Sequence, residues 1–256
     1  MLRELKFIKG NELREPIAIL GLPGIGLVGK VCVDTIIEAT KPEKVAELYS
    51  PDFPPRVLVD GNGFPRSLKT EIFLWKNEKT KKDIFLITAD AQPQTVDGQF
   101  KFAREILDYL TSLGVKLIVA CAANDIGREV KEPKVHVVST NKEVLKEFLK
   151  SKIAVTFRHG GISGGNGMIP VLAHELYGID GVCLLAETSR LTERFFTIDP
   201  KASRAIVNVL NEVLGLDVPT DKLDEKIEEI EETIKKFRER AGEKTKEGGE
   251  ERPYIS

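Results

Sequence analysis

Apolar residues occur along most of this chain either in short continuous runs or at helical spacing, the pattern of an α/β protein. An apolar run over residues 17–20 predicts a buried strand, and the spacing over 28–39 predicts a helix. Four β-rich runs follow, separated by turns that are charged or rich in Pro and Gly: 45–49, 56–59, 71–75 and 84–88. No helical pattern lies between them. Because parallel neighbours need a crossover of about a dozen residues, we predict an antiparallel or mixed insertion.

Strands and helices alternate again in the second half. The pattern predicts helices over residues 100–113, 143–150, 170–176 and 201–214. It predicts strands over residues 116–122, 135–138, 153–157 and 181–186, several of them continuously apolar, as in sheets covered on both faces. Asn141 is the expected N-cap of the second of these helices. We therefore predict one domain over residues 1–216, a three-layer α/β sandwich with a mixed, mostly parallel sheet.

The C-terminal region has a different pattern. A charged helix is expected over residues 217–240, and its large apolar residues follow the 4, 3, 4, 3 spacing of a helix-packing stripe: Leu223, Ile227, Ile230, Ile234 and Phe237. The stripe either packs on its own domain or covers a neighbouring subunit, so these residues are candidates for an oligomer interface. Residues 241–256 begin with a stretch rich in Gly, Lys and Glu, which predicts a flexible tail.

Composition excludes several classes of protein. The 256 residues are 41% hydrophobic, which allows a substantial core, and 38 basic residues against 40 acidic ones leave a formal charge of −2. This balance provides no basic field for nucleic acid or an anionic membrane. No apolar run approaches the roughly 20 residues of a membrane span, and the N-terminus lacks a signal-peptide pattern. Three scattered cysteines indicate a reducing compartment, and a charged fraction of 30% is typical of thermophiles. We expect a cytoplasmic protein.

The turn after the first strand matches two nucleotide-binding patterns. Gly24, Gly26 and Gly29 form G-x-G-x-x-G, and residues 24–30 form G-x-x-x-x-G-K, ending in Lys30. Both patterns are incomplete, because Val31 stands where a P-loop needs Ser or Thr and no acid follows at the end of the second strand. Close packing between strand and helix is the favoured explanation of the glycines. A cofactor or phosphate site in this loop remains an alternative, and we expect no cofactor.

The remaining candidate residues give only weak indications of a metal site or a catalytic site. The three histidines are too far apart in sequence to show metal-ligand spacing, so no metal site is predicted. Ser163 and His159 lie in or beside the glycine-rich stretch 160–167, where they are candidates for a nucleophile and its base, but the G-x-S-x-G pattern is missing. Asp90 follows a strand and either binds magnesium or fixes the turn before the next helix through hydrogen bonds to the backbone. We predict no catalytic residues.

Three stretches together resemble the proteasome assembly chaperone 2 family, in its archaeal branch. They are residues 21–29, residues 89–93 and residues 160–170, continued by 184–188, and the likeness covers roughly residues 10–215. The resemblance implies a phosphorylase- or hydrolase-like α/β sandwich without established catalysis, which assembles into small homo-oligomers. It also implies binding to 20S proteasome α-subunits, in some members through a C-terminal hydrophobic–Tyr–any motif that enters pockets between those subunits.

The C-terminal motif maps onto Pro253, Tyr254 and Ile255, and Ser256 adds one residue beyond it. An aromatic ring, a branched side chain and a carboxylate suit a pocket with a cation at its base. The extra residue moves the carboxylate about 3.5 Å from its place in the family pattern. We therefore expect a non-enzymatic proteasome assembly chaperone or adaptor, with no nucleic acid or membrane partner. A nucleotide- or phosphate-binding enzyme that uses residues 24–29, Asp90 and residues 160–167 is the alternative.

Overall fold

The computed structural model describes residues 1–189 and 198–247, and of residues 236–247 it describes only the helical backbone. Nine strands form one sheet, with a two-stranded hairpin beside it made of β4 (Val57–Val59) and β5 (Pro65–Ser67). The order of strands across the large sheet is β1 (Leu2–Glu4), β3 (Glu43–Leu48), β6 (Thr70–Asn77), β7 (Lys82–Ala89), β2 (Ile17–Gly21), β8 (Leu117–Asp125), β11 (Asp180–Thr188), β9 (Val135–Ser139) and β10 (Ala154–Thr156).

The centre of the sheet is parallel and its flanks are antiparallel. Strands β7, β2, β8 and β11 run parallel to one another. On one side β6, β3 and β1 are each added antiparallel, which confirms the predicted antiparallel insertion. On the other side β9 is antiparallel to β11, and β10 is parallel to β9. The sheet is thus mixed, as predicted.

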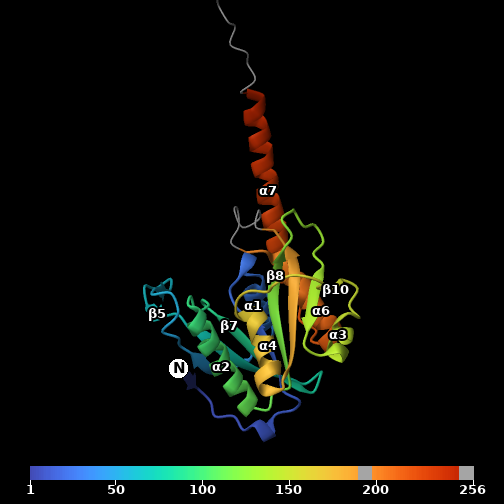
Figure 1. Ribbon diagram of the computed structural model, residues 1–256. Coiled ribbons are helices and arrows are strands. Elements are labelled where there is room, and N and C mark those ends of the chain that lie inside the picture. Colours follow the sequence, from blue (N-terminus) through green and yellow to red (C-terminus); the bar gives the residue numbers. More distant parts are fainter. Residues whose placement is uncertain (190–197, 248–256) are drawn as a thin grey trace, which may run out of the picture.

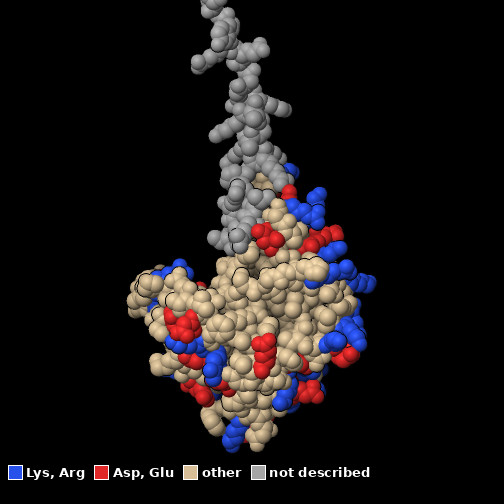
Figure 2. All heavy atoms as spheres, viewed as in Figure 1, with Lys and Arg blue, Asp and Glu red and all other residues tan. Residues whose placement is uncertain are grey.

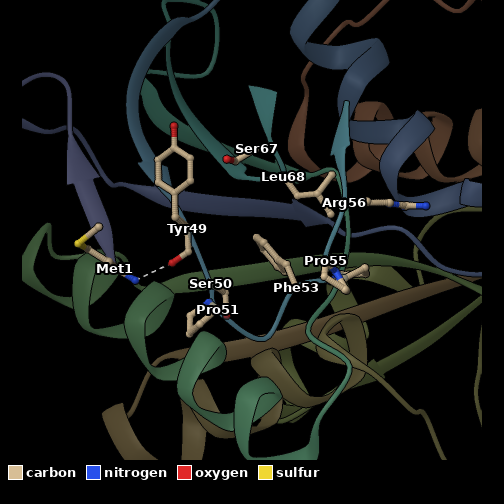
Figure 3. A pocket seen from close by; sticks show the side chains of 10 residues that line it. Met1, Tyr49, Ser50, Pro51, Phe53, Pro55, Arg56, Ser67 and Leu68 are labelled. Atoms are coloured by element: carbon tan, nitrogen blue, oxygen red, sulfur yellow. Dashed lines mark hydrogen bonds between the residues drawn. The ribbon is translucent and has the colours of Figure 1, made fainter. Parts of the chain in front are cut away.

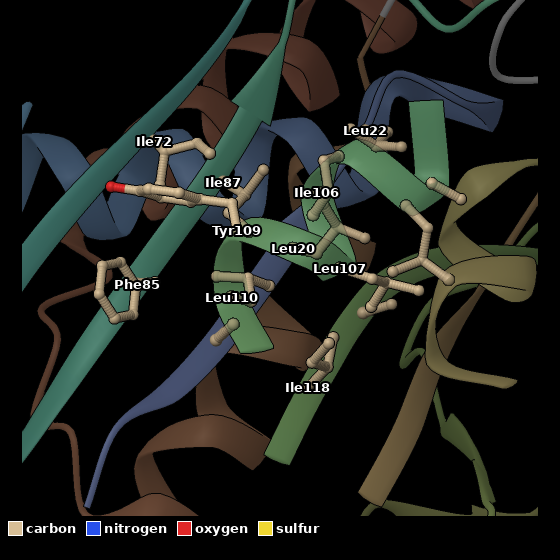
Figure 4. Packing of buried hydrophobic residues seen from close by; sticks show 14 of the residues in the cluster. Leu20, Leu22, Ile72, Phe85, Ile87, Ile106, Leu107, Tyr109, Leu110 and Ile118 are labelled. Atoms are coloured by element: carbon tan, nitrogen blue, oxygen red, sulfur yellow. The ribbon is translucent and has the colours of Figure 1, made fainter. Parts of the chain in front are cut away.

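Helices cover both faces of the sheet (Figure 1). One face carries α2 (Val96–Ser112) and α4 (Gly165–Tyr177), and the other carries α1 (Val28–Thr40), α3 (Lys142–Phe148) and α6 (Pro200–Leu214). Figure 4 shows Ile106 and Leu107 of α2 packed over sheet residues such as Ile87, all fully buried. Two separate cores result, one on each face, and the predicted three-layer sandwich is confirmed.

Element boundaries differ from the predictions mainly where polar residues continue an apolar element. Strand β8 extends to Asp125 and β11 to Thr188, because the ladder between them continues past their apolar centres. Helix α2 begins at Val96, four residues earlier than predicted, since the Thr95 side chain caps it by accepting from the backbone N–H of Gly98 at 2.9 Å. The short strands β1 and β5 were not predicted.

The C-terminal helix α7 (Asp221–Glu247) begins four residues later than the predicted helix 217–240 and continues through residues 241–247, which were predicted as part of a flexible tail. Its added residues Ala241–Glu247 are mostly Ala, Glu and Lys, which are strong helix formers. The helix leaves the body at the carboxyl end of the parallel strands and projects away from it (Figure 1). In the described part of the chain, no helix combines the length and the apolar character of a membrane span.

Two residues of the predicted interface stripe are in fact core residues. Leu223 is 1% exposed and Ile227 is 7% exposed, because α7 begins by packing against α6. Neither side chain is therefore available to another subunit. Ile230 and Ile234 are half-buried. The side chain of Phe237 and the C-terminal residues Pro253, Tyr254, Ile255 and Ser256 lie outside the described part.

Candidate functional site

The loops that carry the sequence motifs meet at the carboxyl edge of the parallel strands. Strands β2, β7, β8 and β11 end there at Gly21, Ala89, Asp125 and Thr188. In open α/β sheets this edge is the usual position of a ligand crevice. Stretches that are more than 140 residues apart in sequence come into direct contact here, as the hydrogen bonds below show.

Asn166 joins the first and third motif stretches. Its Oδ1 accepts from the backbone N–H of Leu22 at 2.9 Å, and its Nδ2 donates to the carbonyl of Leu22 at 3.0 Å. Asn166 is 6% exposed and Leu22 is fully buried. The amide side chain thus takes the place of a strand partner for Leu22, the residue that follows β2.

Gln92 joins the second stretch to the other two. Its Nε2 donates to the carbonyl of Pro23 at 2.6 Å, and its Oε1 accepts from the N–H of Gly165 at 2.7 Å. Gly165 is the first residue of α4, whose free N–H groups would otherwise favour an anion. The side chain of Gln92 therefore occupies part of the position that a bound phosphate would need.

Close backbone packing explains two glycines of the first loop. A Cβ atom on Gly21 would lie 2.0 Å from the carbonyl oxygen of Gly29, and one on Gly29 would lie 2.1 Å from the carbonyl oxygen of Cys121. Gly26 has a φ of +56°, and its carbonyl accepts from the N–H of Asp199 at 2.8 Å. Gly24 is different, because the nearest atom to its added Cβ is 3.9 Å away. Helix α1 packs directly on the sheet through these contacts.

The lysine of the P-loop-like sequence is directed to a carboxylate. Lys30 Nζ lies 2.9 Å from Asp34 Oδ2 and donates to Thr88 Oγ1 at 3.2 Å. Thr88 Oγ1 in turn donates to Asp34 Oδ1 at 2.7 Å. The lysine of a P-loop reaches the β- and γ-phosphates, whereas this lysine joins α1 to β7.

Asp90 anchors the β4–β5 hairpin. It accepts from Arg66 Nη1 at 2.5 Å, from Arg66 Nη2 at 2.9 Å and from the backbone N–H of Lys69 at 3.0 Å. Burial of Asp90 acts to raise its pKa, but the hydrogen bonds from Arg66 and Lys69 outweigh this effect and hold the pKa below its ordinary value. Asp90 thus holds the hairpin and the segment before β6, and the turn before α2, which the sequence analysis assigned to it, is capped by Thr95 instead. Among the described residues, no group of three or more His, Cys, Asp or Glu side chains is arranged to bind a metal.

His159 and Ser163 are both exposed, and no hydrogen bond joins them within the described residues. The other two histidines have acidic partners: His136 Nε2 lies 3.1 Å from Glu187 Oε1, and His174 Nδ1 lies 4.0 Å from Asp180 Oδ1. A nucleophile and its base need hydrogen-bonding distance. The geometry of the 160–167 loop does not show such a pair.

Asp199 completes the contacts of this edge. Its Oδ2 accepts from Thr188 Oγ1 at 2.6 Å, and its Oδ1 accepts from the N–H of Ala202, so that it caps α6. The sequence analysis missed Asn166, Gln92 and Asp199 as the residues that join the loops. The first two do lie within or beside the stretches that carry the family resemblance. Asn166 and Gln92 bond to the backbone of the loops, and Asp199 bonds to Thr188 and to the backbone of α6, so that these side chains hold the loops together.

Comparisons with known proteins agree with this geometry. The structure of PbaB from Pyrococcus furiosus, an archaeal proteasome activator, is similar with a TM-score of 0.83 and 29% identity, covering 93% of this chain and 98% of that one. The structure of PbaA from the same organism, an archaeal homologue of proteasome-assembly chaperone, gives a TM-score of 0.72 and 25% identity, covering 92% of each chain. The uncharacterized protein MJ1210 of Methanocaldococcus jannaschii is 30% identical over 240 residues, which cover 93% of this chain and 89% of that protein. The model of the PAC2 family matches residues 18–238, and the chain therefore belongs to the PAC2 family.

Proposed function

We propose that this protein is a non-enzymatic proteasome assembly chaperone or activator that binds the α-ring of the 20S proteasome. The observation that carries the proposal is the likeness to PbaB, which extends over nearly the full length of both chains. PbaB is described as a proteasome activator and PbaA as a homologue of proteasome-assembly chaperone. A fold alone does not determine function, but likeness at 29% identity over the whole chain supports a shared kind of partner.

The carboxyl edge of the sheet supports binding rather than catalysis. Asn166 and Gln92 use their amide groups on the loop backbone, and Lys30 is paired with Asp34. Groups that hold the scaffold in this way are not available for a substrate. We infer that the glycine-rich loops position α1 and α4 on the sheet.

Self-association is the second part of the proposal. Helix α7 projects from the body (Figure 1), and a single exposed helix is marginally stable in water. Ile230 and Ile234 are half-buried, and Phe237 continues their spacing along α7. Contact between the α7 helices of several copies buries these residues. It also brings several copies of residues 253–256 to one symmetric ring, where avidity exceeds the affinity of one segment.

A pull-down of 20S proteasome tests the role of the C-terminal residues. Deletion of residues 253–256, or the single change Tyr254→Ala, is expected to abolish binding without changing the molar mass of the oligomer. Removal of Ser256 alone, which makes Tyr254 penultimate as in the family pattern, is expected to preserve or strengthen binding. Unchanged binding by the deletion variant would refute the role of this segment.

A second arm tests the helix and the competing enzyme hypothesis. Ile230→Asp with Ile234→Asp is expected to lower the molar mass and, through lost avidity, proteasome binding. Calorimetry with ATP, NAD and inorganic phosphate is expected to show no saturable heat. Micromolar binding that disappears in Gly26→Val would instead support a nucleotide- or phosphate-binding enzyme.

A further inference from the structure

The β4–β5 hairpin stands out from the body of the molecule (Figure 1). It is held by the Arg66–Asp90 ion pair and by Leu58, which packs against the core. The segment that leads into β4 borders an open cavity of about 420 Å³. Figure 3 shows Phe53 beside Leu68 there, while Arg56 extends away from them. Arg56 is exposed, and its guanidinium has no partner among the described residues.

The two edges of this hairpin differ in their free hydrogen-bonding groups. The backbone N–H of Asp60 donates to the carbonyl of Phe64 at 3.1 Å, and the register places Leu58 opposite Arg66. Because backbone groups in a strand alternate in direction, Leu58 and Asp60 face β5. The N–H and C=O groups of Val57 and Val59 therefore face outward. No described residue satisfies them.

The outer edge of β5, in contrast, is closed to further strands. Pro65 has no N–H to donate, and the carbonyl of Ser67 accepts from Arg66 Nη1 at 3.2 Å. Proline at an outward position is a common protection of edge strands. Strand β4 has no such protection within the strand itself.

Strand β4 also carries exposed apolar side chains. Val57 is 57% exposed and Val59 is 62% exposed, and Phe64 in the adjoining turn is 71% exposed. Figure 2 shows uncharged surface on the tip of the lobe that contains the hairpin, with basic side chains along its upper edge and charged side chains below it. Clustered apolar residues beside an open strand edge mark an interaction surface.

We propose that β4 pairs antiparallel with β4 of a second copy of this chain, about a two-fold axis at Leu58. This register places Val57 opposite the partner subunit's Val59, and Val59 opposite the partner subunit's Val57. Every outward N–H and C=O of both strands is then used in hydrogen-bonded pairs. A two-fold axis at Val57 would place Val59 opposite the partner subunit's Pro55, which has no N–H.

The charges at the ends of β4 complement each other in the same register. Arg56 lies two residues before Leu58 and Asp60 two residues after it, so each Arg56 meets the partner subunit's Asp60. Asp60 Oδ1 accepts from the N–H groups of Asn62 and Phe64, at 2.9 Å each, which keeps the carboxylate in place. Exposed ion pairs contribute little to affinity, but opposite charges directly across two strands favour one register over others. The result is a four-stranded sheet with the protected β5 strands at its outer edges.

Residue-resolved amide hydrogen exchange, with molar mass from light scattering, tests this pairing. In the full-length protein, exchange at Val57 and Val59 is expected to slow by about tenfold or more between dilute and concentrated solutions. Exchange at Leu58, which bonds to β5, is the internal control and stays constant. Fast exchange at Val57 and Val59 at every concentration overturns the proposal.

Two kinds of variant test the same pairing. Val59→Pro removes an outward N–H and leaves the bonds to β5, so it is expected to lower the molar mass and restore fast exchange at Val57. Val59→Thr keeps the N–H and the branched shape and is expected to behave as the wild type. Arg56→Asp, which leaves the hairpin bonds intact, places two carboxylates together and raises the midpoint concentration of association. An unchanged mass and midpoint in Val59→Pro and Arg56→Asp would refute the pairing.

This inference is independent of proteasome binding. Deletion of residues 253–256 is expected to leave the protection of Val57 and Val59 unchanged, even if it abolishes capture of the 20S proteasome. Loss of that protection on deletion would show that the C-terminal segment, rather than a second β4, covers this edge. The pairing of β4 and the role of the C-terminal segment in proteasome binding can therefore be refuted independently of each other.

Discussion

Asn166→Ala removes both hydrogen bonds that hold the end of β2. The bonds join Asn166 to the N–H and C=O of Leu22 at 2.9 and 3.0 Å, and Leu22 is fully buried. Alanine leaves both backbone groups without a partner and without access to water. Each unsatisfied buried group costs about 1–3 kcal/mol, so the loss of two partners should lower the free energy of unfolding by roughly 2–6 kcal/mol. For a chain of this size that lowers Tm by roughly 4–24 °C, because 1 kcal/mol corresponds to about 2–4 °C.

Asn211 provides a matched control. Its side chain makes the same pair of bonds to one backbone residue, with Nδ2 donating to the carbonyl of Val218 at 2.8 Å and Oδ1 accepting from its N–H at 2.9 Å. Val218 is 4% exposed, but Asn211 itself is half-buried, so water can enter the position of its amide when the side chain is removed. Asn211→Ala should therefore cost about 1 kcal/mol.

Urea unfolding measures how much unfolding free energy each variant loses, provided that the slope of this free energy against urea concentration stays the same as in the wild type. A loss of under about 1 kcal/mol in Asn166→Ala, or equal losses in the two variants, would contradict the role given to buried, unpaired backbone groups.

Gly29→Ala should lower the free energy of unfolding by about 1–3 kcal/mol or more, because its Cβ would lie 2.1 Å from the carbonyl oxygen of Cys121. Gly24→Ala, with 3.9 Å of space, should change it by less than about 0.5 kcal/mol in the same urea assay. Acid unfolding tests a second contact: the hydrogen bond from Lys69 holds the pKa of Glu47 below its ordinary value of 4.5. The ionised carboxylate therefore stabilises the fold above pH 4.5, and this contribution is lost as pH falls through the lower folded-state value. Lys69→Met should make the decline in stability below that pH shallower, and an equally steep decline would refute the assignment.

Local sequence pattern predicted most of the elements. The apolar run before the first glycine loop became β2, and the helical spacing after it became α1. The absence of a helical pattern between residues 45 and 88 correctly indicated antiparallel strands there, because a parallel crossover needs more chain than those turns contain. These features depend on residues a few positions apart.

The partners of the polar groups in the candidate site did not follow from local pattern. Gln92 and Asn166 lie in loops whose sequence shows only glycine and polar residues, and their bonds join positions 69 to 144 residues apart. In the sequence, Lys30 stands at the position of a phosphate-binding lysine. In the fold, it bonds to Asp34 and Thr88 instead. Sequence shows which groups are present, and packing decides what they bond to.

The sequence by itself determined the order of strands and helices, because each element depends on residues near one another in the chain. It also determined the family, because the three motif stretches can be recognised by their residues and order without the fold. Only the tertiary structure decided that the first half of the α7 stripe is core, that the glycine loops are held by amide side chains, and that β4 has one open edge. These three outcomes depend on which surfaces meet when distant stretches of chain are brought together. The spacing of apolar residues along the chain does not show which surfaces will meet.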